Sequence, residues 1–313
     1  THTHTHMRTL NTLKRKLRCT ARKWHKHAHT HHTAYTTQHH NTPQHHNTTQ
    51  HNTTLSCHPP QMASISNKQV KSASVVKKQT RTHFDDAVNG LATGLSARLA
   101  AAVSRSGTSA HRRYLVGIAG PPGSGKSLLA EQLLSSLRAL GTSAQLITLD
   151  GFHYTRAELD RFPDAAQAHL RRGSPFTFDL PAFRCAVQCV RDSCQERYAL
   201  PSFDHALKDP VPNDIVVLPE HELILVEGNY LALCDDQDEE RGDAEECVAR
   251  WSDLSLLFDE LWFLDGPADF FVRRVTRRHE EVWHWSHERA QAQADANDAL
   301  NIRRVLDAVS PRV

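Results

Sequence analysis

Acidic residues are missing from the N-terminal part of the chain. Residues 1–84 contain 13 Lys and Arg but no Asp or Glu. The remaining residues hold 37 − 13 = 24 basic side chains and all 35 acidic ones, a net charge of −11, which the overall charge of +2 conceals. An acidic body argues against a nucleic-acid-binding face on a folded domain, and a basic tail would bind polyanions only without specificity. We therefore expect no specific nucleic-acid partner.

Long apolar runs and regularly spaced cysteines are absent as well. No run of about 18 apolar residues occurs, so no membrane-spanning helix is expected. The seven cysteines lack the close, even spacing of a secreted disulfide framework. Without a secretory signal, these features predict a cytoplasmic protein. The acid-free, Ser/Lys-rich stretch 62–83 leaves a mitochondrial transit peptide as the alternative.

Residues 1–60 have few apolar side chains, and Thr, His, Asn and Gln alternate along them. Such a tract buries too little apolar surface to offset the entropy lost on ordering. The sequence therefore predicts a disordered, low-complexity His/Thr-rich and basic tail over residues 1–83 and a folded domain over residues 84–313.

Apolar strands and amphipathic helices alternate through the second part of the chain. We expect strands at 114–119, 145–149, 215–218, 223–226 and 260–264, and helices at 85–104, 127–140, 181–194, from about 268, and at 295–309. Buried strands that alternate with helices predict a mainly parallel sheet covered on both faces. The expected fold is a three-layer α/β/α domain.

One Gly-rich segment, GPPGSGKS at 120–127, follows the first apolar strand of this domain and opens a helix. It satisfies the Walker A pattern G-x-x-x-x-G-K-[ST], and its context separates it from a chance Gly-rich turn. Backbone N–H groups and the helix N-terminus would face phosphates, Lys126 would neutralise them, and Ser127 would ligate Mg²⁺. The predicted ATP-binding residues are Gly120, Gly123, Ser124, Gly125, Lys126 and Ser127.

Two carboxylates come at the ends of neighbouring strands and narrow the class of P-loop protein. The guanine-specific N-K-x-D motif is absent, and the strand LILVEG ends in the single acid Glu227 rather than in Asp-Glu, which leaves a small-molecule kinase. Asp150 could accept the proton of a substrate hydroxyl, and Glu227 could hold Mg²⁺. The alternative for each acid is a solvated strand end.

Several motifs in order resemble the phosphoribulokinase/uridine kinase family of P-loop kinases, which includes pantothenate kinase. They run from about Tyr114 to Asn301 and include GPPGSGKS, LDGFHY, RRGSPFTFD, PSFDHALKDPV, VEGNYL and RRVTRRH. The resemblance implies that Asp150 is the catalytic base and that Glu227 lies near the metal. It also implies that Arg274 and Arg278 belong to a mobile lid that approaches the transferred phosphoryl group, although the basic helix could be merely a solvated face. The resemblance places His153, Tyr154 and Arg156 in the segment that faces the acceptor substrate. Loops that help close this substrate pocket would contain Arg172, Asp179, Asp204 and His205.

The sequence as a whole predicts an ATP-dependent, Mg²⁺-using phosphotransferase. It would move the γ-phosphate to a hydroxyl of a nucleoside, sugar or vitamin-like metabolite, with Asp150, Lys126, Arg274 and Arg278 as catalytic residues. A nucleotide-binding switch or an ATPase without acceptor phosphorylation is the alternative, and the intact Asp150 favours the kinase. A homo-oligomer is left open. One departure from the family is the bulky segment EEVWHWSHERA after the basic helix, where relatives often have a Gly-containing turn.

Overall fold

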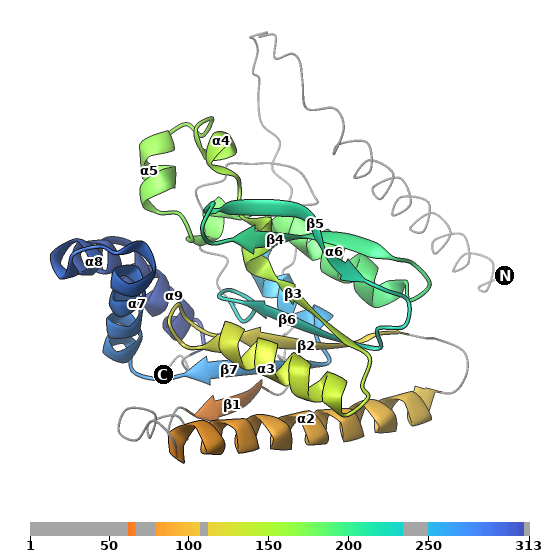
Figure 1. Cartoon of the computed structure of the whole chain (residues 1–313). Helices are drawn as coiled ribbons and strands as arrows, with labels where there is room; N and C mark the ends of the chain where they lie inside the picture. Colours follow the sequence, from red (N-terminus) through yellow and green to blue (C-terminus); the bar gives the residue numbers. More distant parts are fainter. Residues whose placement is uncertain (1–61, 67–78, 107–111, 234–249, 310–313) are drawn as a thin grey trace, which may run out of the picture. The chain divides into compact units, whose positions relative to one another are not determined.

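The computed structural model describes residues 62–66, 79–106, 112–233 and 250–309. The chain divides into two units, Thr1–Ser56 and Cys57–Val313, and every described element belongs to the second unit (Figure 1). Most of the predicted disordered tail therefore lies outside the described residues.

Five parallel strands form the main sheet, in the order β1-β7-β2-β6-β3. They are β1 (Met62–Ser66), β2 (Tyr114–Ala119), β3 (Ala144–Thr148), β6 (Leu223–Gly228) and β7 (Glu260–Asp265). The prediction of a mainly parallel sheet is confirmed. Strand β1 lies before the expected domain boundary at residue 84, in a stretch for which the sequence suggested no regular structure.

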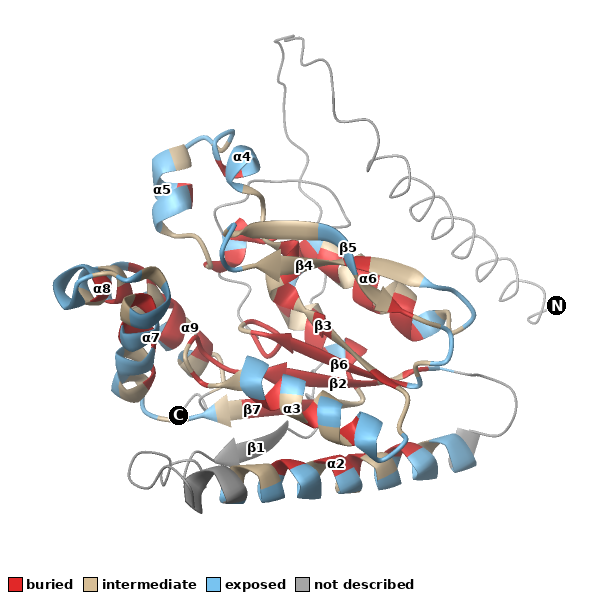
Figure 2. Cartoon of the chain, viewed as in Figure 1, coloured by how far each residue is buried: buried red, intermediate tan, exposed pale blue. Residues whose placement is uncertain are grey.

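Each face of this sheet has its own hydrophobic core (Figure 2). Helices α2 (Gln79–Ser106) and α3 (Lys126–Ala139) pack with Val116, Leu225 and Trp262. Helix α6 (Leu180–Asp192) and the 3-10 helix η4 (Trp251–Leu257) pack on the other face. Successive residues such as Leu115 and Val116 enter opposite cores because side chains alternate along a strand. The sheet with helices packed on both of its faces forms the three-layer α/β/α architecture.

A second, two-stranded antiparallel sheet was not predicted. It pairs β4 (Tyr198–Asp204) with β5 (Asp209–Val217), and the strand expected at 215–218 is the end of β5. Strand β4 crosses the 3-10 turn η2 (Leu149–Phe152), where a Cβ on Gly151 would collide with the carbonyl oxygen of Pro201. The hairpin therefore lies directly against the turn that carries Asp150.

The remaining elements frame the edge of the sheet at which the strands end. Short helices α4 (Arg156–Leu159), α5 (Ala165–Leu170) and η3 (Pro175–Thr177) follow η2. Strand β7 leads into α7 (Ala268–Trp283), and α8 (His287–Gln293), the π-helical turn η5 (Ala294–Asp298) and α9 (Ala299–Asp307) come after it (Figure 1). The helix predicted at 295–309 is thus the end of a longer, π-interrupted helical stretch. None of the described helices has the length and apolarity needed to cross a bilayer.

Candidate active site

The Gly-rich loop joins β2 to α3 and leaves the first turn of that helix open. Gly125, at the N-cap of α3, has φ 93°, and no side chain caps the helix there. Uncapped backbone N–H groups at a helix N-terminus form a site for phosphate. Gly123 has φ 78°, and a Cβ there would lie 2.8 Å from the carbonyl oxygen of Phe271 on α7. The loop is therefore shaped for phosphate and packed tightly against α7.

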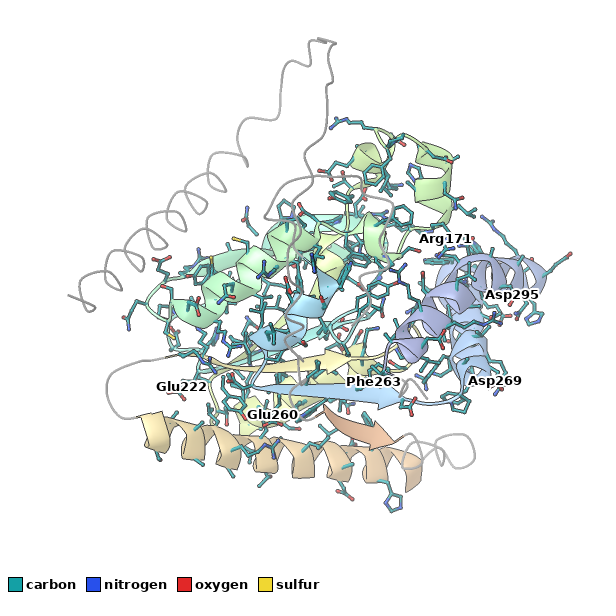
Figure 3. All side chains as sticks on the ribbon, turned by 180° about the vertical axis from the view of Figure 1, so that it is seen from behind. Arg171, Glu222, Glu260, Phe263, Asp269 and Asp295 are labelled. Carbon is teal, nitrogen blue, oxygen red and sulfur yellow. The ribbon has the colours of Figure 1, made fainter. Side chains whose placement is uncertain are left out.

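Helix α7 carries four arginines beside this loop, and they differ in their ion pairs. Arg273 pairs with Asp269 at 2.6 Å, and Arg277 pairs with Glu281 at 2.6 Å. Figure 3 labels Asp269 near the start of α7. Within the part of the chain that the structure describes, Arg274 and Arg278 form no ion pair, and burial together with the charge of Arg278 lowers the pKa of Arg274.

A cavity of about 430 Å³ brings the loop and the helix together. Its lining residues are Gly123, Gly125, Lys126, Ser127, Leu128, Arg274, Arg277, Arg278 and Glu281. Lys126, Arg274 and Arg278, which form no ion pair with any described residue, thus line one cavity, while Arg277 is already neutralised by Glu281. Such a cavity suits a polyphosphate, whose charge would offset their mutual repulsion.

The different pairing of the arginines predicts different effects for two neighbouring substitutions. We expect Arg274→Gln to lower the rate of phosphoryl transfer roughly 10- to 100-fold, because it removes a cation from the phosphate cavity. Arg273→Gln removes the same charge from the same helix but only breaks an exposed pair with Asp269, so it should change the rate less than about twofold. Steady-state kinetics of the two purified variants would test this, and equal effects would contradict the assignment.

Two carboxylates lie where β3 and β6 end. Glu227 sits between Ile118 of β2 and Thr148 of β3 in the sheet. It is 2 % exposed, and its Oε1 accepts a hydrogen bond from the Ser127 hydroxyl at 3.2 Å. Burial raises the pKa of Glu227 to about 7, against the opposing effect of Lys126. Its Oε2 is buried with no hydrogen-bond partner among the described residues.

This arrangement fits a Mg²⁺ ion. A buried carboxylate oxygen without a partner is costly unless a cation or a donor satisfies it. A hydroxyl and a carboxylate beside a phosphate loop are also the ligand types that Mg²⁺ prefers. Ser127 and Glu227, the two residues predicted as metal ligands, lie within hydrogen-bond distance of each other.

Asp150 lies in the 3-10 turn that follows β3. Its side chain is 32 % exposed, and its charge contributes to raising the pKa of Glu227. The backbone carbonyl of Asp150 lies 2.8 Å from Nδ1 of His153, whose ring packs 3.9 Å from Phe178 and 5.0 Å from Phe203 between ring centroids. Burial lowers the pKa of His153. His153 therefore holds the Asp150 turn in place from an aromatic layer, and the Asp150 carboxylate stays accessible.

The other residues predicted to face the acceptor surround the hairpin. Arg172 donates to the carbonyl of Tyr154 at 2.9 Å, and both Arg172 and Arg156 bind the carboxylate of Asp209 at 2.9 and 3.1 Å. Asp209 was not singled out from the sequence, although it lies in the motif PSFDHALKDPV. Its two ion pairs join α4 and the segment after α5 to the hairpin.

Two of the predicted acidic residues bind backbone amides instead. Asp179 caps α6 by accepting from the Ala182 amide at 2.9 Å. Asp204 accepts from the amides of Ala206 and Leu207 in the hairpin turn, and the exposed His205 follows it. Neither acid is among the residues that line the phosphate cavity. Their contacts shape the loops around the site.

The fold and this site define a P-loop kinase, and comparisons with known proteins agree. No family model matches the chain. The chain is 35 % identical to the "Putative uridine kinase C227.14" of Schizosaccharomyces pombe over 61 % of its own length and 77 % of that protein. It is 31 % identical to the "ATP-dependent kinase YFH7" of Zygosaccharomyces rouxii over 52 % of this chain, but the match spans only 48 % of that protein.

A solved structure shows the same relationship. The "putative fructose transport system kinase" of Silicibacter sp. TM1040 is 29 % identical, with a TM-score of 0.58 over 72 % of this chain and 96 % of that one. The chain belongs to the uridine kinase-like family of P-loop kinases, as the ordered motifs suggested.

Proposed function

We propose that the protein transfers the γ-phosphate of ATP to a hydroxyl group of a small metabolite, with Asp150 as general base. The observation that carries this proposal is the cavity in which Lys126 and Ser127 of the loop face Arg274 and Arg278 of α7. Asp150 and Glu227 at the adjoining strand ends support it. The chain is a kinase by family, and the acceptor and the base are the finer points proposed here.

Each step assigns a task to residues of this chain. The amides of the loop and Lys126 would bind the β- and γ-phosphates. Asp150 would accept the proton of the acceptor hydroxyl as its oxygen attacks the γ-phosphorus. Arg274 and Arg278, which line the same cavity, would stabilise the negative charge on the transferred group. Ser127 and Glu227 would hold Mg²⁺, which supplies further charge neutralisation at the phosphates.

The proposed role of Glu227 as a metal ligand predicts that its buried carboxylate lowers the stability of the protein while it allows Mg²⁺ to bind. At pH 8 the Glu227 carboxylate of the wild-type protein is charged although it is buried. Because burial raises its pKa in the folded state, this charge makes the folded protein less stable than it would be with a neutral side chain at position 227. We therefore expect Glu227→Gln to raise the melting temperature at pH 8. The gain should shrink as the pH falls through 7 toward 4.5, because the wild-type carboxyl is then protonated in the folded state and finally in both states.

The same variant should lose its response to the metal. Mg²⁺ added to ATP should raise the melting temperature of the wild type beyond the effect of ATP with EDTA, and this extra shift should vanish in Glu227→Gln. An unchanged extra shift in the variant would contradict the role of Glu227 as a metal ligand.

ADP release measured across a panel of hydroxylated metabolites tests the proposal itself. Uridine comes first, because the S. pombe relative is described as a uridine kinase. Sugars, nucleotides and vitamins complete the panel. Turnover that rises with one acceptor supports a metabolite kinase. Hydrolysis that no acceptor stimulates would instead support a nucleotide-binding switch or a slow ATPase.

A further inference from the structure

Four cations gather around the tip of the β4–β5 hairpin: Arg156, Arg172, Lys208 and Arg289, here called the tip cluster. Lys208 Nζ lies 4.1 Å from the ring centroid of Trp283 and 5.5 Å from that of Trp285. The guanidinium carbon of Arg289 lies 4.1 Å from the same Trp285 ring. The hairpin tip thus meets the segment that connects α7 to α8.

The other two members reach Lys208 through the hairpin backbone. Arg172 donates a hydrogen bond to the carbonyl oxygen of Lys208, and it shares Asp209 with Arg156. Among the described residues, Asp209 is the carboxylate that forms ion pairs with members of the cluster. Four positive charges face one negative charge, a local excess of 4 − 1 = +3.

The four cations of the tip cluster lie close together despite their mutual electrostatic repulsion. Burial, Arg289, Arg156 and Arg172 all lower the pKa of Lys208. Arg172 Nε is buried with no hydrogen-bond partner among the described residues. Lys208 and Arg289 rest on indole rings rather than on carboxylates, and a cation–π contact is weaker than a desolvated charge pair. A cluster of positive charges that carboxylates do not fully neutralise favours the binding of an anion.

The tip cluster lies on the acceptor side of the candidate active site. The His153 ring touches the Asp150 turn on one side and Phe203 on the other, and the Arg172 guanidinium carbon lies 5.7 Å from the centroid of the Phe203 ring. Helix α4, which begins at Arg156, follows the same turn. The cluster is therefore connected to the proposed base through a single aromatic layer.

We propose that the acceptor carries an anionic group, phosphate or carboxylate, that binds the tip cluster while its hydroxyl reaches Asp150. This inference rests on the proposed kinase activity and narrows the class of acceptor. The anion would take Lys208 and Arg289 as partners and relieve the repulsion in the cluster. Because these two cations contact the α7–α8 connection, the bound anion would also join the hairpin to the helix that carries Arg274 and Arg278.

Matched pairs of acceptors test this proposal. Ribose 5-phosphate is compared with ribose, uridine monophosphate with uridine, and pantothenate with panthenol, so that phosphate and carboxylate form separate arms. We expect an anionic member of a pair to stimulate ADP release more than its neutral partner. Lys208→Met, which keeps length but loses charge, should raise the KM for that anion roughly tenfold or more with little change in kcat. Arg303→Gln removes one charge from an exposed position on α9 and should leave KM unchanged.

A direct binding measurement distinguishes a failure of the proposed anion site from a failure of the proposed kinase activity. Tryptophan emission, measured with saturating Mg·ADP, should respond to the anionic compound in the wild type but not in Lys208→Met, because Trp283 and Trp285 contact the cluster. Such binding without stimulated turnover would support the anion site and contradict the kinase proposal. Stimulation by neutral acceptors alone, or equal KM values in wild type and Lys208→Met, would overturn the anion site and leave the kinase proposal standing.

Discussion

Replacing Lys126 with alanine is expected to lower phosphoryl transfer by roughly 100- to 1,000-fold, one of the two largest effects that the site predicts. Lys126 opens α3 and lines the cavity opposite Arg274 and Arg278. The ammonium group would meet the phosphates where charge develops in the transition state, in a place partly shielded from water. Its loss should therefore reduce kcat as well as weaken nucleotide binding.

Arg138→Ala supplies the matched control. Arg138 lies in the last turn of the same helix and bonds to the carbonyl oxygen of Ala144. This variant loses the same charge and a similar length of side chain, at the opposite end of α3 from the cavity. We expect its kcat to stay within about twofold of the wild type, as for other exposed charges. Turnover in Lys126→Ala within a few-fold of that in Arg138→Ala would contradict the phosphate-binding role.

The sequence predicted the main sheet and the phosphate loop well, because both depend on local signals. The strand expected at 114–119 matches β2, and the helix expected at 127–140 matches α3 within one residue at each end. Apolar runs mark buried parallel strands, and the Gly-rich motif fixes the turn between β2 and α3. The ends of β3 and β6 then placed Asp150 and Glu227 at one edge of the sheet.

The surroundings of the acceptor depend on contacts between distant segments, which no local pattern encodes. The hairpin was missed because β4 contains Pro201 and β5 contains two prolines and Asn213, a composition that argues against a strand. Its two strands pair with each other away from the main sheet, where such residues are tolerated. Asp209 matters because two arginines from other segments converge on it, and only the tertiary structure shows that convergence.

The bulky segment after α7 has a structural role that the sequence did not reveal. Trp283 stacks on His279 at 4.5 Å and lies 4.8 Å from Trp285, and both rings face Lys208 of the hairpin. His284 between them takes a left-handed conformation with φ 53°, a backbone geometry that glycine adopts at lower cost. The two tryptophans therefore bring the connection between α7 and α8 into contact with Lys208 of the hairpin.

Asp150→Asn is expected to lower acceptor-dependent turnover roughly 100- to 10,000-fold, the usual contribution of a general base. The amide keeps the shape of the side chain but cannot accept a proton. The turn should persist because the Asp150 backbone carbonyl bonds to His153, whereas the carboxylate Oδ1 lies farther from His153 Nδ1, at 4.0 Å. Binding of Mg·ATP should stay close to that of the wild type. Slow ATP hydrolysis without an acceptor should persist too, because water reaches the phosphates without this base.

Asp160→Asn provides the comparison, because it makes the same change in an exposed carboxylate that pairs with His169. Its kcat and KM should stay within about twofold of the wild type. Wild-type turnover in Asp150→Asn would refute the base assignment. Loss of Mg·ATP binding in that variant would point to a role in holding the metal or the nucleotide, since a base acts only after both substrates are bound. If Asp150 at the end of β3 accepts the proton, the Asp150→Asn variant should lose turnover but keep nucleotide binding.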